Sequence, residues 1–225
     1  MTLSFVRTSI AVALVAALAA CGGKASFEVR GTVSGLAYPG LKLVNGDQSV
    51  EPVPAAGSIG AANEVAFVFP KSIDYGTTYD VRIADKPLAV GQTVAEKFFP
   101  LHQTCELING ADTAGRLAAI HVSVQCTINA YAVGGTVKGL TKDGLVLING
   151  TTGGQRVVNH VAPTAPATAA PDVTYSFANA VTYNTTYGVS ILTQPTGQTC
   201  SFDNEATRTG TMGDAPVLNI NITCV

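Results

Sequence analysis

Residues 27–46 read FEVRGTVSGLAYPGLKLVNG, and residues 131–150 read YAVGGTVKGLTKDGLVLING. Without a gap, the two stretches are identical at eleven of their twenty positions. The identical residues are mostly alternating apolar positions and turn glycines, which are the positions that a β-sheet and its hairpins constrain. The chain therefore contains an internal duplication, and the duplicated unit is built from strands.

The match resumes after loops of different length. In chain order the matching pieces are 65–83 against 173–191, 103–105 against 198–200, and Cys126 against Cys224. The repeated unit is roughly 100 residues long, which is too long for a solenoid repeat and right for a whole domain. We therefore expect two domains of the same fold.

Each unit contains about seven short runs of alternating polarity. In the second unit they fall near 131–138, 144–149, 155–161, 172–178, 186–192, 199–203 and 217–224. No window shows the sustained 3.6-residue period of an amphipathic helix. We predict an all-β protein with two tandem antiparallel β-sandwich domains of immunoglobulin type, 27–126 and 131–225, joined by residues 127–130. Because Trp is absent, the likeness to antibody domains would be architectural only.

The first twenty residues have the layout of an export signal. Arg7 is followed by an uncharged stretch that ends Leu18-Ala19-Ala20 before Cys21. This ending resembles the lipobox of bacterial lipoproteins. The resemblance implies a signal peptide at 1–20, acyl chains on Cys21 and a short lipidated tether at 21–26.

A transmembrane helix is the alternative interpretation of residues 1–20. A helix needs about 20 consecutive apolar residues to cross the hydrocarbon core of a bilayer, and this run is shorter. No acidic residue follows Cys21 at the second mature position, which carries Gly22. By resemblance to Gram-negative sorting, we expect a lipid anchor in the outer membrane, with the protein facing the periplasm or the cell surface.

The cysteine count agrees with an exported protein. If Cys21 carries lipid, an even set of four remains, which suits an oxidising compartment. Four thiols allow three connectivities, but only Cys105–Cys126 and Cys200–Cys224 place the same bond in both units. We predict these two structural disulfides.

The recurring motifs resemble the Ig-like repeats of bacterial secreted proteins and lipoproteins. In the second unit they are Gly135–Leu140, Gly144–Gly150, Tyr187-Gly188-Val189 and the closing run TQPTGQTC at 193–200. The first unit departs from the pattern, because an insertion at 94–104 separates the similar run KPLAVGQT from Cys105. The resemblance implies a fold and a compartment but no catalytic residues.

No grouping of residues predicts an active site or a metal site. His102, His121 and His160 are the only histidines and lie in separate segments, whereas a metal needs three or four convergent ligands. Without Arg7 the chain would carry 12 basic and 15 acidic residues, a net charge of −3 that does not indicate nucleic-acid binding. We therefore expect no catalytic residues, no metal and no cofactor.

Three insertions are the better functional clues. Two are rich in Pro, Ala and Gly and occupy corresponding places in the units, at 51–64 and 161–172. The third contains Phe98, Phe99, Pro100 and Leu101, an apolar cluster of the kind that often marks a contact surface. The alternative is that these four residues pack between domains or against the membrane-proximal face.

The sequence thus predicts a non-catalytic envelope lipoprotein that acts as a binding, adhesion or structural spacer module. Its membrane contact would be the lipid on Cys21, and its partner an envelope protein or a surface glycan. Two alternatives stay open: an envelope enzyme or enzyme inhibitor with an unrecognised site, and an accessory subunit of an envelope complex.

Overall fold

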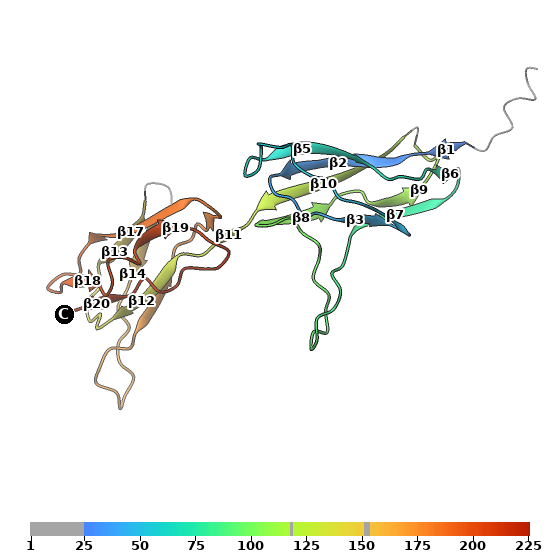
Figure 1. Ribbon diagram of the computed structural model, residues 1–225. Coiled ribbons are helices and arrows are strands. Elements are labelled where there is room, and N and C mark those ends of the chain that lie inside the picture. The colour runs from blue at the N-terminus through green and yellow to red at the C-terminus, as the bar shows by residue number, and fades with distance from the viewer. Residues whose placement is uncertain (1–24, 118, 151–153) are drawn as a thin grey trace, which may run out of the picture. The chain divides into compact units, whose positions relative to one another are not determined.

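The computed structural model describes residues 25–117, 119–150 and 154–225 (Figure 1). The signal peptide expected at 1–20 and Cys21 lie outside these residues. The regular secondary structure of the described residues consists of β-strands. The chain divides into two compact units: the first runs to Leu101 and continues over Cys105–Cys126, and the second comprises His102–Thr104 and Thr127–Val225. The short segment His102–Thr104, which the sequence assigned to the first domain, thus groups with the second.

The first unit is a sandwich of two four-stranded sheets and one small two-stranded pair. In spatial order the first sheet is β5 (Asn63–Val68), β2 (Val29–Leu36), β10 (Ile120–Ile128) and β8 (Gln103–Leu107). The second is β4 (Gln48–Val50), β3 (Leu43–Asn45), β7 (Thr78–Ile83) and β9 (Ala111–Thr113). The small pair is β1 (Ser26–Phe27) and β6 (Ile73–Asp74).

The second unit repeats this topology strand for strand. Its sheets are β15 (Val173–Ser176), β12 (Gly134–Lys138), β20 (Ile222–Cys224) and β18 (Cys200–Phe202), and β14 (Gln155–Val158), β13 (Leu145–Asn149), β17 (Thr186–Thr193) and β19 (Thr209–Thr211). The small pair is β11 (Ala130–Tyr131) and β16 (Val181–Thr182). The predicted all-β fold with two sandwich domains is confirmed.

One pairing in each unit differs from the antiparallel prediction. The first long strand runs parallel to the last one, so that β2 pairs with β10 and β12 pairs with β20. A parallel pair cannot be closed by a short hairpin and needs a long crossover connection, which here is the remainder of the domain. The repeat therefore brings its beginning and its end together in one sheet.

Alternation along the strands builds a separate core in each unit. In β2 the side chains of Val29 and Val33 are fully buried, whereas Arg30 and Thr32 between them are more exposed. The equivalent residues of the second unit are Val133 and Val137, which are also fully buried. Each core is lined by residues from both sheets, so each unit has its own hydrophobic stabilisation.

Asn45 and Asn149 are buried, and each makes the same contact in its own unit. The Oδ1 atom of Asn45 accepts a hydrogen bond from the backbone N–H of Asp80, at 3.1 Å. Asn149 accepts the equivalent bond from the backbone N–H of Gly188, at 2.9 Å. In each unit this contact ties the end of one strand to its neighbour, and the buried amide oxygen is satisfied.

Both predicted disulfides are present. Cys105 of β8 is bonded to Cys126 of β10, and Cys200 of β18 to Cys224 of β20. In the second unit the two cysteines are direct cross-strand partners. The repeat-based choice among the three connectivities is therefore confirmed.

Candidate functional site

The three histidines make three separate polar contacts. His102 Nδ1 lies 2.7 Å from Asp214 Oδ1, and its ring stacks on Tyr183 within the second unit. His121 Nε2 lies 3.3 Å from the hydroxyl of Thr32. Among residues 25–117, 119–150 and 154–225, no three His, Cys, Asp or Glu side chains gather closely enough to hold a metal ion.

The third histidine forms a small electrostatic pair on the surface. The ring of His160 lies 2.8 Å from Asp143 Oδ1, and the backbone N–H of His160 donates to the same oxygen at 2.9 Å. The ring contact is the larger cause that lowers the pKa of Asp143 below its ordinary value of 3.8. A carboxyl group whose pKa is lower in the folded state than in the unfolded state stabilises the fold at pH values above its unfolded-state pKa. This stabilisation is lost as the pH falls through the folded-state pKa.

This pair gives a direct titration test. We expect NMR of the side-chain carboxyl to show Asp143 titrating below its ordinary pKa, and His160→Ala to raise that pKa while the backbone bond keeps part of the shift. The pKa of Asp47, which is lowered by hydrogen bonding to Lys71, should stay unchanged and serves as the control. An Asp143 pKa that does not respond to His160→Ala would contradict the assignment.

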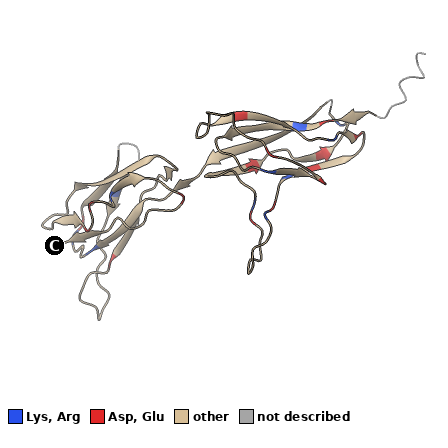
Figure 2. Ribbon diagram, in the orientation of Figure 1, with Lys and Arg blue, Asp and Glu red and all other residues tan. Residues whose placement is uncertain are grey.

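In the part of the chain that the structure describes, charged residues do not gather into a large patch of one sign. Figure 2 shows blue and red segments scattered singly over the described ribbon. Most of the ion pairs join exposed side chains, such as Lys71 with Asp47. Surface pairs of this kind contribute little to stability.

The predicted apolar contact patch is largely built into the first sandwich. Pro100 is buried, and Phe99 is half-buried and packs against the first core. Phe98 is half-buried beside the ammonium group of Lys42, which lies 5.8 Å from the ring centroid. Only Leu101, at 61% exposure, keeps a mainly exposed side chain. Three of the four residues are thus wholly or partly covered, because the backbone around Phe98 pairs with the sandwich. A contact of this cluster with a partner stays a prediction.

The pairing just before Phe98 forms the stem of a projecting hairpin, residues 85–97 (Figure 1). The backbone N–H of Lys86 donates to Glu96 O at 2.7 Å, and Asp85 pairs with Lys97 in an antiparallel bridge. Two cross-strand ion pairs brace the same stem, Lys86–Glu96 at 3.3 Å and Lys97–Asp85 at 2.7 Å. The hairpin is therefore an ordered projection with a net-neutral stem.

The tip of this hairpin is apolar and exposed. The backbone N–H of Gln92 donates to Ala89 O at 3.0 Å, and the Gln92 side chain accepts from the N–H of Ala89 at 3.2 Å. Gly91 has a φ of 88°, which a type II turn requires at its third position. This turn holds Val90 outward with 108% relative exposure, the highest among the exposed large hydrophobic residues. Leu88 and Val94 flank it with 59% and 77% exposure.

The matching run of the second unit, TQPTGQTC, is folded inward instead. The side-chain amide of Gln194 bonds both backbone groups of Cys200, at 2.8 and 2.9 Å. The side chain of Gln198 accepts from the N–H groups of Thr141 and Lys142 and donates to the carbonyl of Gly139. The run TQPTGQTC thus holds neighbouring backbone segments together in the second unit, whereas the similar run of the first unit forms the projecting tip of the hairpin.

A second projecting loop belongs to the second unit and contains the Pro- and Ala-rich residues 161–172. The side chains from Val161 to Ala169 are exposed, and the loop carries no charge before Asp172. A turn closes it where the N–H of Ala167 donates to the carbonyl of Thr164, at 3.0 Å. The corresponding insertion of the first unit, 51–64, contains a similar turn in which Ser58 donates to Ala55 O.

The sequence contained a signal for the hairpin that the motif comparison missed. Residues 85–97 read DKPLAVGQTVAEK, with two charges at each end and none between. Such charge placement is typical of a hairpin with a solvated stem.

The chain matches no model of a known protein family, and no curated protein matches it significantly. The described residues also contain no helix that is long and apolar enough to cross a membrane.

Proposed function

We propose that this chain is a lipid-anchored envelope protein whose two Ig-like sandwiches serve as a non-catalytic binding, adhesion or spacer module. The anchor is the acylated Cys21 in the outer membrane. The contacts are made by loops and sheet faces, with an envelope protein or a surface glycan as partner.

The cysteine distribution is the observation that carries the anchoring part of the proposal. The chain has five cysteines, and the two disulfides use four of them. The fifth is Cys21, which follows Leu18-Ala19-Ala20 at the end of an uncharged stretch. Disulfides persist in oxidising compartments such as the periplasm and the cell surface, so the paired cysteines favour the same destination as the lipobox-like ending.

The architecture supports a binding role rather than a catalytic one. Each sandwich has its own hydrophobic core and its own disulfide. The hairpin 85–97 carries Val90, the most exposed of the large hydrophobic residues in the described part of the chain. Binding residues are often placed on loops that a rigid scaffold positions. The hairpin 85–97 and the loop 161–172 are therefore the proposed contact elements.

Metabolic labelling tests the anchor. Cells that express the full chain are fed an alkyne fatty acid, and we expect the purified protein to carry the label and to sediment with membranes. Cys21→Ser should abolish both the label and the membrane fraction, because the lipid is joined to the protein through a thioether bond that the sulfur of Cys21 forms. Label on the Cys21→Ser chain, or no label on the original chain, would contradict the proposal.

Protease treatment of intact cells then determines the side of the membrane. Cleavage of the second unit while periplasmic control proteins survive would indicate a surface module and direct the search to surface ligands. Protection until the outer membrane is opened would indicate a periplasmic module and direct it to envelope proteins.

A further inference from the structure

The duplication gives each Pro- and Ala-rich insertion a counterpart in the other unit. Residues 51–64 follow β4 and lead into β5, and residues 161–172 lie between the equivalent strands β14 and β15. The first insertion contains one hydroxyl side chain, Ser58, and the second contains two, Thr164 and Thr168. The insertions differ in how firmly the fold holds them, and this difference decides which hydroxyl groups an enzyme can reach.

The insertion of the first unit is tied to its sandwich. Two of its prolines are buried, and the backbone N–H of Gly60 donates to the carbonyl of Ala37 at 2.9 Å. Ser58 is half-buried, and its hydroxyl donates to the carbonyl of Ala55 at 2.6 Å. A hydroxyl group engaged in this way is a poor acceptor for a covalent group, because its hydrogen bond must break and its surroundings must open first.

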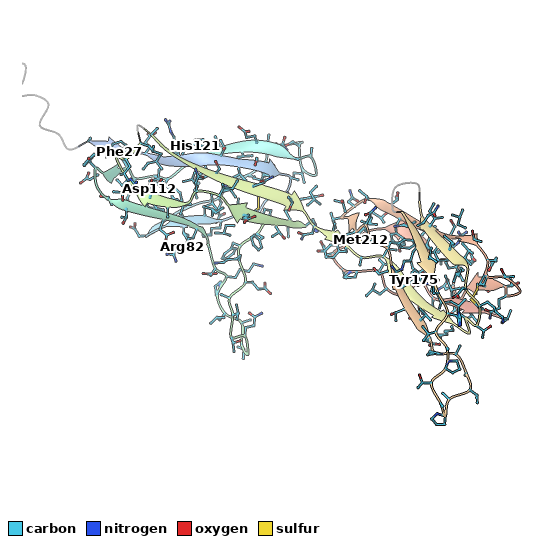
Figure 3. All side chains as sticks on the ribbon, turned by 180° about the vertical axis from the view of Figure 1, so that it is seen from behind. Phe27, Arg82, Asp112, His121, Tyr175 and Met212 are labelled. Carbon is cyan, nitrogen blue, oxygen red and sulfur yellow. A yellow bond between two sulfur atoms is a disulfide. The ribbon has the colours of Figure 1, made fainter. Side chains whose placement is uncertain are left out.

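The hydroxyl groups of the second insertion are not held in this way. The nine side chains of residues 161–169 are all exposed. Neither Thr164 nor Thr168 forms a side-chain hydrogen bond with another residue of the described ranges. The backbone turn between them is closed by the N–H of Ala167, which donates to the carbonyl of Thr164 at 3.0 Å. Figure 3 shows the loop extending below the second unit, away from the labelled Tyr175 of its core.

The composition of the loop agrees with a modification site. Residues 161–172 comprise five Ala, three Pro, two Thr, one Val and one Asp. Because proline lacks a backbone N–H, this segment is poorly suited to extend the strands on either side of it, and it stays available as an irregular acceptor. Segments that combine hydroxyl side chains with Pro are typical carriers of O-linked sugars.

We propose that residues 161–172 are an O-glycosylation site, with a sugar attached through the hydroxyl of Thr164, Thr168 or both. In this step the threonine Oγ1 attacks the anomeric carbon of a glycosyl diphosphate, and a carbon–oxygen bond forms. The bond between that carbon and the diphosphate oxygen breaks, and the diphosphate leaves with the electron pair. The hydroxyl proton passes to a base of the transferase, and no oxidant or reductant is needed.

A sugar at this place changes the chemistry of the proposed contact element. The loop would present hydroxyl groups in place of methyl groups, so its contact with a partner would be made through carbohydrate. The loop lies outside the core of the second unit, and the modification therefore leaves the fold unchanged. The inference concerns the loop alone and does not depend on the lipid at Cys21.

Thr196 offers a matched control within the same unit. Like Thr164, it is exposed and follows a proline. Its neighbours are held, however: Pro195 is buried, and the side chain of Gln198 donates to the carbonyl of Gly139 at 2.7 Å. An enzyme that must seat residues on both sides of the acceptor can take the loop but not this clamp, so Thr196 should stay unmodified.

Mass spectrometry of the full chain, purified from the envelope of cells that naturally produce it, tests the proposal. After reduction, trypsin releases residues 157–208 as one fragment, which contains both the loop and Thr196. We expect this fragment to carry a sugar, which electron-transfer fragmentation places on Thr164 or Thr168. Thr164→Ala with Thr168→Ala should remove all of it, whereas Thr164→Ser with Thr168→Ser should retain it. Thr196→Ala should leave the modification unchanged.

A chain expressed without residues 1–20 identifies the sugar donor. A sugar on this cytoplasmic chain assigns the transfer to a nucleotide sugar, and a sugar on the exported chain alone assigns it to a donor linked to a membrane lipid. Circular dichroism and melting should show the double alanine variant folded as before, so that lost sugar reports the lost hydroxyl groups. The proposal is overturned by a fragment without sugar from the natural protein, by a sugar that persists in the double alanine variant, or by a sugar on Thr196 with none on the loop.

Discussion

Gly135→Ala is expected to destabilise the second unit by about 3 kcal/mol or more, which is a large fraction of the stability of an ordinary domain. A Cβ at this position would lie 2.0 Å from the carbonyl oxygen of Ile220 and 2.5 Å from its carbonyl carbon. Both atoms belong to the backbone of the chain leading into β20, so no side chain can rotate away. Room for the methyl group requires β12 to separate from its parallel neighbour, and this breaks the sheet that joins the two ends of the repeat.

Chemical denaturation followed by a probe in each unit measures the effect. Gly213→Ala is the matched control, because its Cβ would meet no heavy atom within 4 Å. The first unit has its own core and should unfold where it did before. Gly31→Ala should act in the mirrored way on the first unit, since its Cβ would lie 1.9 Å from the carbonyl oxygen of Val122. If Gly135→Ala behaved like Gly213→Ala, the close approach of these strands would be wrong.

The class of fold was predictable from the sequence because alternation is a local property. The runs near 144–149 and 186–192 correspond to β13 and β17 within one residue. The run near 217–224 was less accurate: only Ile222–Cys224 belongs to β20, and Leu218 is 56% exposed. The parallel pairing was not predictable, because the direction of a neighbouring strand is decided by the path of the whole chain and leaves no mark in the alternation.

The contacts of residues 98–101 were likewise not predictable from the local sequence. Phe98 and Phe99 stand in a segment without alternation, so the sequence left open whether they form a contact surface or pack against the protein. The structure pairs the N–H of Phe98 with the carbonyl of Ala84 and the N–H of Lys42 with the carbonyl of Phe98, which draws the segment onto the sandwich. These contacts join residues far apart in sequence. The exposed apolar tip lies eight residues earlier, at Val90, in a run whose letters resemble the inward clamp of the second unit.

Removing the Cys200–Cys224 disulfide by a double change to Ala is expected to lower the free energy of unfolding of the second unit by about 3.5 kcal/mol. The sequence separation of 24 residues sets this value, because the bond restricts the unfolded chain over that loop. The melting temperature of the unit should fall by roughly 14 to 28 °C. Calorimetry of the double variant, with the first unit unchanged, measures the effect.

The Cys200–Cys224 disulfide fastens a short edge strand, and the second unit therefore depends on it. β18 has only three residues, lies at the edge of its sheet and pairs on one side, with β20. The amide of Gln194 holds the other side at Cys200 through two hydrogen bonds, so Gln194→Ala in the disulfide-free chain should lower stability further. The double Ala variant of Cys105 and Cys126 is the matched comparison: it should move the transition of the first unit by a similar amount and leave the second in place. A disulfide-free second unit that melts at the original temperature would show that the edge strand is held by its hydrogen bonds alone.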